Sequence, residues 1–180
     1  MSFDRPSRRG FLGVATGAAF GLLAPRSAFT EPSAPRVLRF DHLHTGEKLE
    51  IEYWRGGTYE TEGLDAINHL MRDFRTGDVH PIDRPLLDLL HDLARATSTR
   101  RPFEIISAYR SPATNASLHQ LSDGVASNSL HLQGKAIDIR LGDVRLKDLR
   151  GAALQARGGG VGYYPDSNFV HVDTGRVRTW

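Results

Sequence analysis

Ser129-Leu-His-Leu-Gln-Gly-Lys-Ala-Ile-Asp138 is the stretch that decides the fold of this chain, together with Phe169-Val-His-Val-Asp173 further on. The Gln-Gly pair in the first motif is typical of a turn between two extended runs, so His131 and Asp138 should face each other across a short connection. The second motif adds His171. Two imidazoles and a carboxylate form the mixed nitrogen and oxygen ligand set of a catalytic zinc ion, which leaves its fourth position to water.

Side-chain alternation along the two motifs places the candidate ligands on shared faces. In an extended run, Ala136 and Asp138 point one way, whereas Ile137 points into the core. The period of two also puts His171 and Asp173 on one face of the second run, with its two valines on the other. One strand should therefore bring both an imidazole and a second acid to the site.

The spacing S-x-H-x-x-G-x-A-x-D followed by a late H-x-D resembles the zinc D-alanyl-D-alanine carboxypeptidase and murein endopeptidase family. This family shares its fold with Hedgehog-type and lysostaphin-type metallopeptidases. With Ser-Ala-Tyr-Arg-Ser at 107–111 and Gly-Arg-Val-Arg-Thr-Trp at 175–180, the resemblance covers roughly residues 60–180. It is strongest to the murein endopeptidase K-like group, whose members are short exported proteins with a twin-arginine leader.

The resemblance also implies roles for individual residues. It implies that His131, Asp138 and His171 bind one zinc ion. Arg110 matches the family arginine that binds substrate carbonyl or carboxylate oxygens and the charge that develops on them. For substrate binding we predict three further residues, although the last would pack equally well as an ordinary sheet residue: Tyr109, Ser129 and Tyr164.

The chain departs from the family at the general base. Many relatives have a Glu three residues before the last zinc histidine, and others have a His two residues before it, but these positions here are Asn168 and Phe169. Neither side chain can accept a proton from water. Asp173 is the remaining candidate, either as the catalytic base or as a partner that orients the His171 imidazole.

These residues predict a zinc metallopeptidase that hydrolyses peptide cross-links of peptidoglycan, and the resemblance suggests the L,D type that joins two diaminopimelate residues. Two alternatives stay open. One is a zinc-containing cell-wall binding protein without activity, and the other is a D,D-dipeptidase or carboxypeptidase. We expect a monomer.

Residues 1–34 are typical of a twin-arginine signal segment, because Arg8-Arg9 precede an apolar run rich in Gly and Ala. That run is too short for a comfortable membrane span, so contact with the membrane is expected only during export or through an uncleaved leader. The chain has 23 basic and 21 acidic residues, of which four basic and two acidic residues lie in this segment. The rest of the chain therefore has 19 basic and 19 acidic residues. The neutral balance excludes a nucleic-acid binding surface built on net positive charge, and the predicted location is the periplasm or cell envelope.

The remaining pattern predicts an α+β fold, with a small, mainly antiparallel sheet that carries the zinc site and is flanked by helices. Residues 35–59 should form an N-terminal β-hairpin extension around Thr45-Gly46, and residues 60–180 the peptidase domain. Helices are expected over 62–75, over 84–96 with Asp83 as the cap, and over 145–157. The histidines outside the motifs read as ordinary surface, loop or helix residues. The chain has no cysteine, so neither a disulfide nor a thiolate metal site is available.

Overall fold

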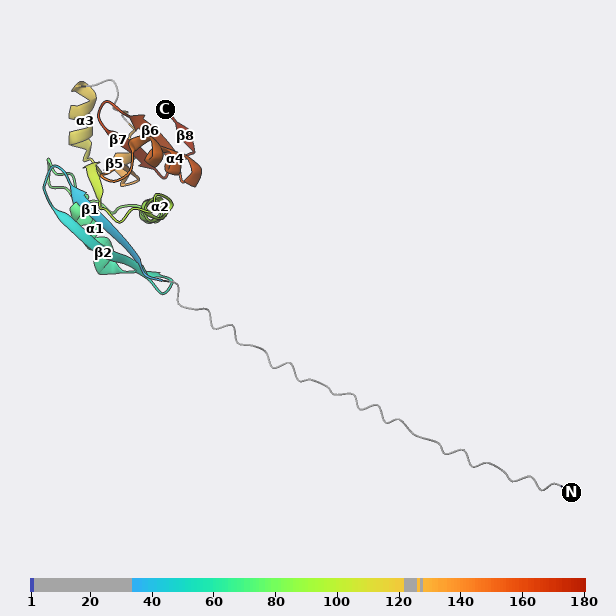
Figure 1. Cartoon of the computed structure of the whole chain (residues 1–180). Helices are drawn as coiled ribbons and strands as arrows, with labels where there is room; N and C mark the ends of the chain where they lie inside the picture. The colour runs from blue at the N-terminus through green and yellow to red at the C-terminus, as the bar shows by residue number, and fades with distance from the viewer. Residues whose placement is uncertain (2–33, 122–125, 127) are drawn as a thin grey trace. The chain divides into compact units, whose positions relative to one another are not determined.

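A computed structural model describes Met1 and residues 34–121, 126 and 128–180 of the chain. The described residues form an α+β fold, as predicted, in which one sheet of eight strands has the order β3-β2-β1-β4-β5-β7-β6-β8 (Figure 1). The strands are β1 (Arg36–His42), β2 (Lys48–Arg55), β3 (Thr58–Tyr59), β4 (Phe103–Ser107), β5 (Ala136–Leu141), β6 (Gly160–Tyr164), β7 (Phe169–Asp173) and β8 (Arg178–Thr179). The helices are α1 (Thr61–Leu70), α2 (Arg84–Ala96), α3 (Pro112–Leu121) and α4 (Leu146–Ala156), with a 3₁₀ helix, η1 (Leu130–Gln133).

The sheet is mixed and larger than the small sheet expected from the sequence. Its β1–β4 and β6–β8 pairs are parallel, and the other pairs are antiparallel. The predicted hairpin is present as β1 and β2, joined by a turn in which Gly46 has a φ of 72°. Because β1 also pairs with β4, the hairpin is part of the same sheet as the strands that carry the candidate ligands.

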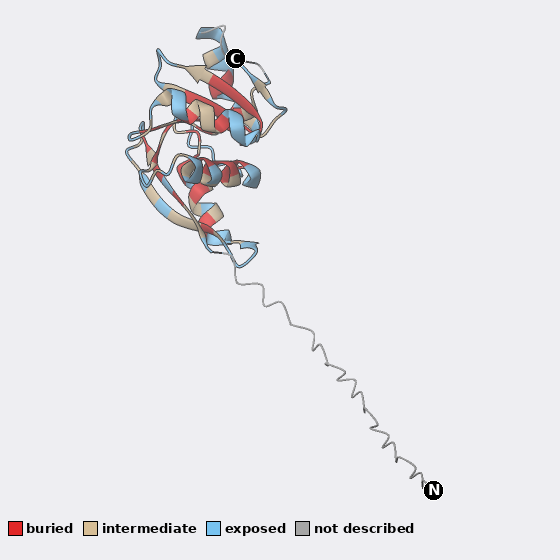
Figure 2. Cartoon of the chain, turned by 45° about the vertical axis from the view of Figure 1, so that its right-hand side comes forward, coloured by how far each residue is buried: buried red, intermediate tan, exposed pale blue. Residues whose placement is uncertain are grey.

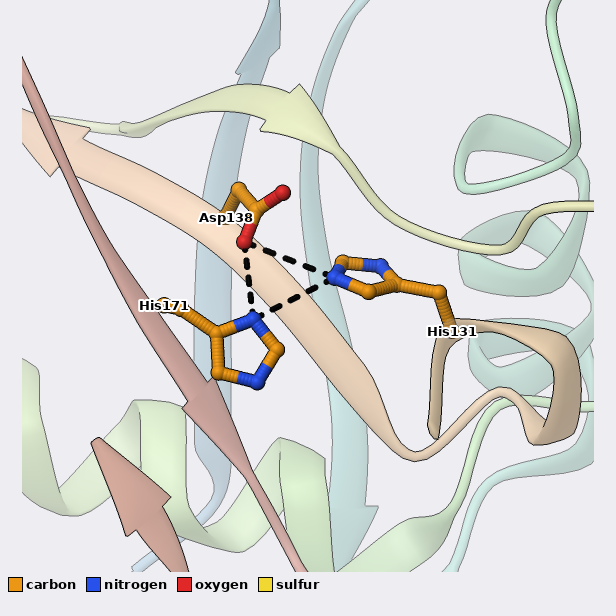
Figure 3. A group of neighbouring side chains, drawn as sticks. All are labelled: His131, Asp138 and His171. Atoms are coloured by element: carbon orange, nitrogen blue, oxygen red, sulfur yellow. Dashed lines mark hydrogen bonds and ion pairs between the residues drawn. The ribbon is translucent and has the colours of Figure 1, made fainter. Parts of the chain in front are cut away.

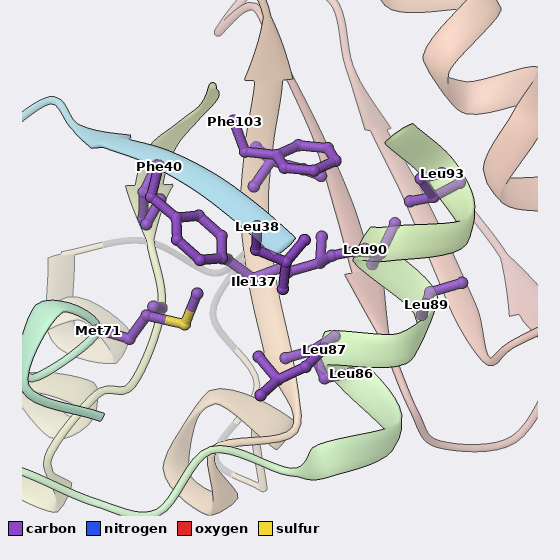
Figure 4. Packing of buried hydrophobic residues seen from close by; sticks show 14 of the residues in the cluster. Leu38, Phe40, Met71, Leu86, Leu87, Leu89, Leu90, Leu93, Phe103 and Ile137 are labelled. Carbon is purple, nitrogen blue, oxygen red and sulfur yellow. The ribbon is translucent and has the colours of Figure 1, made fainter. Parts of the chain in front are cut away.

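The apolar core lies between the sheet and three helices. Buried residues, red in Figure 2, include five leucines on one face of α2, which pack against alternate residues of the strands (Figure 4). Ile137 and Ile139 of β5 and Val170 and Val172 of β7 all belong to this core. Since strand side chains alternate, Asp138 and the other polar residues of these strands lie on the opposite face of the sheet.

Two local predictions were wrong in detail. The helix expected over 62–75 ends at Leu70, because the buried carboxylate of Asp73 accepts a hydrogen bond from the Arg75 N–H and turns the chain. Asp83 does precede α2, but its side chain does not cap the helix. Instead, its carboxylate accepts a hydrogen bond of 2.6 Å from the Thr174 hydroxyl, a residue 91 positions away.

Two further differences concern histidines. The run before Gly134 that was expected to be extended is the 3₁₀ helix η1, which includes His131. His42 is buried instead of lying in a solvated loop, and its Nδ1 accepts hydrogen bonds from the backbone of His44 and Thr45. The first segment is too short to show a helical period, and the second difference depends on what packs around His42.

The predicted signal segment, apart from Met1 and Ala34, lies outside the described residues. Among the helices of the described part, none combines the length and the apolar character that crossing a bilayer requires.

Candidate metal centre and active site

Strand register places two of the predicted ligands side by side. Asp138 of β5 lies directly opposite His171 of β7 in an antiparallel ladder. The third ligand comes from η1, where the Ser129 hydroxyl accepts a hydrogen bond from the His131 N–H and so caps the first turn. Gly134 ends this short helix with a φ of 64°, a conformation that a residue with a Cβ adopts only with strain. The chain then returns into β5, so that His131 faces Asp138.

The three side chains converge on one point (Figure 3). His131 Nε2 lies 3.2 Å from His171 Nδ1, and Asp138 Oδ1 lies 2.9 Å from His171 Nδ1 and 3.4 Å from His131 Nε2. Ligand atoms around a tetrahedral zinc ion with bonds of about 2.0–2.1 Å are separated by about 3.3 Å. The edges of the triangle therefore match the spacing that such an ion requires.

Each imidazole is oriented by a contact on its other nitrogen. His131 Nδ1 lies 2.6 Å from the carbonyl oxygen of Ala108, and His171 Nε2 lies 3.0 Å from Asp173 Oδ2. Both partners are acceptors, so both of these nitrogens carry the hydrogen of a neutral imidazole. The nitrogens that face each other then present lone pairs, next to a carboxylate oxygen. In these tautomers three acceptors meet without a donor between them, an arrangement that could hold a metal ion.

The pKa shifts of these three residues follow from their burial and from the charges that meet between them. Burial lowers the pKa of His131, which favours the neutral imidazole needed for metal binding. Burial would raise the pKa of Asp138, but the charges and hydrogen bonds of His131 and His171 outweigh it and lower that pKa. For His171, burial lowers the pKa, whereas the contacts with Asp138 and Asp173 raise it, and the net effect is a raised pKa.

Arg110 contacts the second oxygen of the Asp138 carboxylate. Its Nη2 donates to Asp138 Oδ2 at 2.9 Å, and its Nε donates to the Ser107 hydroxyl at 3.0 Å. These bonds leave Asp138 Oδ1 directed at the two imidazoles. The guanidinium thus orients a candidate ligand and also lines the cavity next to it.

The loop that carries Arg110 is held by three consecutive backbone N–H groups. The N–H of Tyr109 donates to the Met71 carbonyl, that of Arg110 to the His131 carbonyl, and that of Ser111 to Asp73 Oδ2. The acceptors belong to two separate segments of the chain, the turn after α1 with Met71 and Asp73, and η1 with His131. The position of Arg110 relative to His131 is therefore set by the tertiary structure.

Asp173 is fully buried, and both of its oxygens have partners. Oδ1 accepts hydrogen bonds from the backbone of Gly160 and Gly175 and from Arg178, and Oδ2 accepts from Arg178 and His171. Burial would raise the pKa of Asp173, but these hydrogen bonds outweigh it and hold the pKa far below its ordinary value. A carboxylate so stabilised is a weak base. Of the two roles predicted for Asp173, its surroundings favour orientation of His171 over proton transfer.

A cavity of about 560 Å³ opens beside the three candidate ligands. Two of the predicted substrate-binding residues, Ser129 and Tyr164, line it. Tyr109 does not line this cavity, and its ring stacks on His80 with the centroids 4.7 Å apart.

The cavity also contains residues that sequence reasoning did not select: Asn128, Ser167, Phe169, Arg178 and Trp180. Of these, Trp180 contacts a candidate ligand, with its ring centroid 5.2 Å from that of His171. The only sequence signal for Trp180 was its place in the segment 175–180, which belongs to the family resemblance. That segment has no alternating or helical pattern from which its side-chain directions could be predicted.

Comparison with known proteins agrees with this geometry. Residues 30–180 match the family model described as peptidoglycan L,D-endopeptidase MepK. The chain is 45% identical over 168 residues to peptidoglycan L,D-endopeptidase MepK of Escherichia coli strain K12, which covers 93% of this chain and 92% of the relative. It is 40% identical over 184 aligned positions to the probable peptidoglycan L,D-endopeptidase MepK of Haemophilus influenzae, covering 100% and 98%. The chain therefore belongs to the MepK family of peptidoglycan L,D-endopeptidases.

Proposed function

We propose that this protein is a zinc-dependent endopeptidase that hydrolyses L,D cross-links between peptides of peptidoglycan. The observation that carries the proposal is the convergence of His131 Nε2, Asp138 Oδ1 and His171 Nδ1, each oriented by a separate hydrogen bond. The names of its relatives support the substrate and the type of bond. We further propose that the protein is exported by the twin-arginine route and acts as a monomer in the periplasm.

The donor set suits zinc, because two imidazoles and one carboxylate are among the ligand sets of catalytic zinc sites. When bound, the ion supplies a Lewis acid that polarises a peptide carbonyl and makes water more acidic. His131, Asp138 and His171 would hold it, and Ala108, Arg110 and Asp173 keep those three ligands in place.

Two residues of the chain have separate roles in this proposal. Arg110 lies in the cavity wall with its positive charge beside Asp138, where it can stabilise negative charge that develops on a substrate oxygen. Asp173 holds the His171 ring and its tautomer through the hydrogen bond to Nε2.

One observation favours a second candidate, a zinc-containing protein that binds the cell wall without cleaving it. Among the described residues that line the cavity, the three candidate ligands are the only Asp, Glu or His side chains. No separate carboxylate or imidazole in that lining could serve as a general base. A D,D-dipeptidase or carboxypeptidase is the third candidate function, and the experiment below distinguishes it from the other two.

The test is digestion of purified sacculi that contain L,D cross-links, followed by mass analysis of the muropeptides. We expect the wild-type protein to convert cross-linked dimers to monomers. His131→Ala should lose this activity, and His69→Ala, which changes an exposed histidine of α1, should keep it. Sedimentation with sacculi but no product would favour the binding protein. Release of small peptides with all dimers intact would favour the dipeptidase or carboxypeptidase.

A further inference from the structure

Two aromatic side chains in the cavity wall are joined by a hydrogen bond. The indole Nε1–H of Trp180 donates to the hydroxyl oxygen of Tyr164, with 2.7 Å between the two atoms. Both residues line the cavity beside the candidate metal ligands. Tyr164 ends β6, and Trp180 follows β8, so strand pairing brings them together.

The ring of Tyr164 is held from another side as well. Phe169 is its cross-strand partner between β6 and β7, and the two rings stack with centroids 4.5 Å apart and an angle of 20° between their planes. Phe169 stands at the position where some family members have a histidine. Here that position supports the tyrosine ring instead.

Trp180 is positioned by its backbone and by its ring. Its N–H donates to the carbonyl of Val161, and its carbonyl accepts from the N–H of Tyr163, which continues the pairing with β6. The Arg178 guanidinium lies 4.7 Å from the ring centroid on one side. The indole also lies against Gly162, where a Cβ would come within 2.8 Å of Trp180 Cε2. Only a glycine leaves this space open.

The hydrogen bond from Trp180 determines what the Tyr164 hydroxyl can do. A phenol hydroxyl has one hydrogen to donate and lone pairs to accept with. Its oxygen already accepts from the indole, and its own hydrogen has no acceptor among the described residues of the protein. That hydrogen is therefore available to a molecule in the cavity.

From this geometry we propose that the Tyr164 hydroxyl donates a hydrogen bond to an acceptor oxygen of the bound peptide, and that Trp180 is a positioning residue that acts through Tyr164. The inference rests on the proposed function, since it needs a peptide in this cavity. The Tyr164 hydroxyl would be a neutral hydrogen-bond donor to the substrate, in addition to the charged guanidinium of Arg110. An indole N–H cannot accept, so Trp180 can fix the hydroxyl only in the donating orientation.

A double-mutant cycle tests the proposal. Wild type, Tyr164→Phe, Trp180→Phe and the double variant are assayed on a purified muropeptide dimer joined through two diaminopimelate residues. Loss of one neutral hydrogen bond to substrate should lower kcat/KM about threefold to tenfold in Tyr164→Phe. Trp180→Phe should lower it less in the wild-type background and cause no further loss when Tyr164 is already Phe.

Two further variants sharpen the test. Gly162→Ala should reproduce the effect of Trp180→Phe, because the new methyl group displaces the indole. Trp54→Phe is the matched control, because this tryptophan also lies under an arginine but does not line the cavity, and it should retain full activity. A rise in KM would place the hydrogen bond in the ground state, and a fall in kcat in the transition state. Either result supports the donor role.

Three outcomes would overturn the proposal. Unchanged kcat/KM in Tyr164→Phe would exclude the donor role. An equal loss from Trp180→Phe in both backgrounds would show that Trp180 does not act through Tyr164. Loss of bound zinc in Trp180→Phe alone would show that it acts through His171 instead. If the wild-type protein leaves the dimer intact, the proposed function itself is wrong. That result is distinct from the other three, because each of them is measured against an active wild type.

Discussion

Asp138 and His171 are opposite each other in the β5–β7 ladder, and their side chains meet with 2.9 Å between Oδ1 and Nδ1. The other face of both strands is packed in the core, which fixes the register that brings the two side chains together. The site is therefore largely preformed, and only His131 comes from outside the strands.

The first prediction concerns the metal. The wild-type protein should bind one equivalent of zinc, measured by elemental analysis after dialysis. At a free zinc concentration 100-fold above its Kd, binding stabilises the fold by about 2.7 kcal/mol and should raise Tm by roughly 5–10 °C. His131→Ala should lose both the zinc and the shift, whereas His69→Ala should keep them. A His131→Ala protein with full zinc content would contradict the assignment of this ligand.

The second prediction separates the two roles of Asp173. If this carboxylate orients His171, Asp173→Asn should weaken zinc affinity by about 10- to 100-fold, as loss of a partner behind a metal ligand typically does. Activity measured at saturating zinc should then recover most of the loss. A general base would behave differently, with normal zinc affinity and a rate reduced by at least about 100-fold at every zinc concentration. Zinc titrations of activity distinguish the two patterns.

The third prediction concerns Arg110. Arg110→Ala removes the positive charge from the cavity and should lower kcat by about 100-fold or more, in the range found when a donor to a developing oxyanion is lost. Arg110→Lys should recover only part of it, because an ammonium group lacks the planar fork that reaches both Ser107 and Asp138. Arg145→Ala, which changes an exposed arginine paired with Asp148, is the control. Full activity in Arg110→Ala would exclude the role in catalysis.

The fourth prediction is a dependence of stability on pH through Asp73. Burial would raise the pKa of this carboxyl group, but hydrogen bonds from Thr114, Ser111 and Arg75 outweigh it and lower the pKa below 3.8. A group with a lower pKa in the folded state contributes its full stability above its unfolded pKa and loses it as the pH falls through the folded one. Asp73→Asn should therefore cost about 1–3 kcal/mol at pH 7, and less below pH 3.8.

Urea unfolding of both proteins at pH 7 and at pH 3 measures this difference. Asp65→Asn, at an exposed position of α1, should unfold like the wild type at pH 7. A constant difference between wild type and Asp73→Asn at the two pH values would show that the Asp73 charge does not contribute. Because Asp73 also holds the Ser111 N–H next to Arg110, we expect its loss to reduce activity as well.

Part of this site could be predicted because it depends on local alternation. The period of two along Phe169–Asp173 was enough to separate His171 and Asp173 from the buried valines, and the structure agrees. The Gln-Gly turn was recognisable for the same reason, since a positive φ at Gly134 is a local requirement. The 3₁₀ helix before it was not recognisable, because four residues carry too little periodicity.

The environment of Asp173 could not be predicted in the same way. The N–H of Gly175 is a local partner, but the N–H of Gly160 and the guanidinium of Arg178 are brought to the carboxylate by the pairing of β6 with β7 and β8. The sequence shows that residue 173 is an aspartate, but it does not show whether the carboxylate oxygens are free or hydrogen-bonded. The role of Asp173 therefore depends in part on contacts with Gly160 and Arg178 that no local pattern contains.

By itself, the sequence determined the kinds of candidate ligand, the side-chain alternation along β5 and β7, and the turn at Gly134, because these depend on chemistry and backbone preferences within a few residues. Only the tertiary structure decided which nitrogen of each imidazole faces the site, whether Asp173 can accept a proton, and that Trp180 reaches Tyr164. The bonds of His131 with Ala108, of Asp173 with Gly160 and of Trp180 with Tyr164 join segments that are separate in the chain, and they exist only once the sheet has its register.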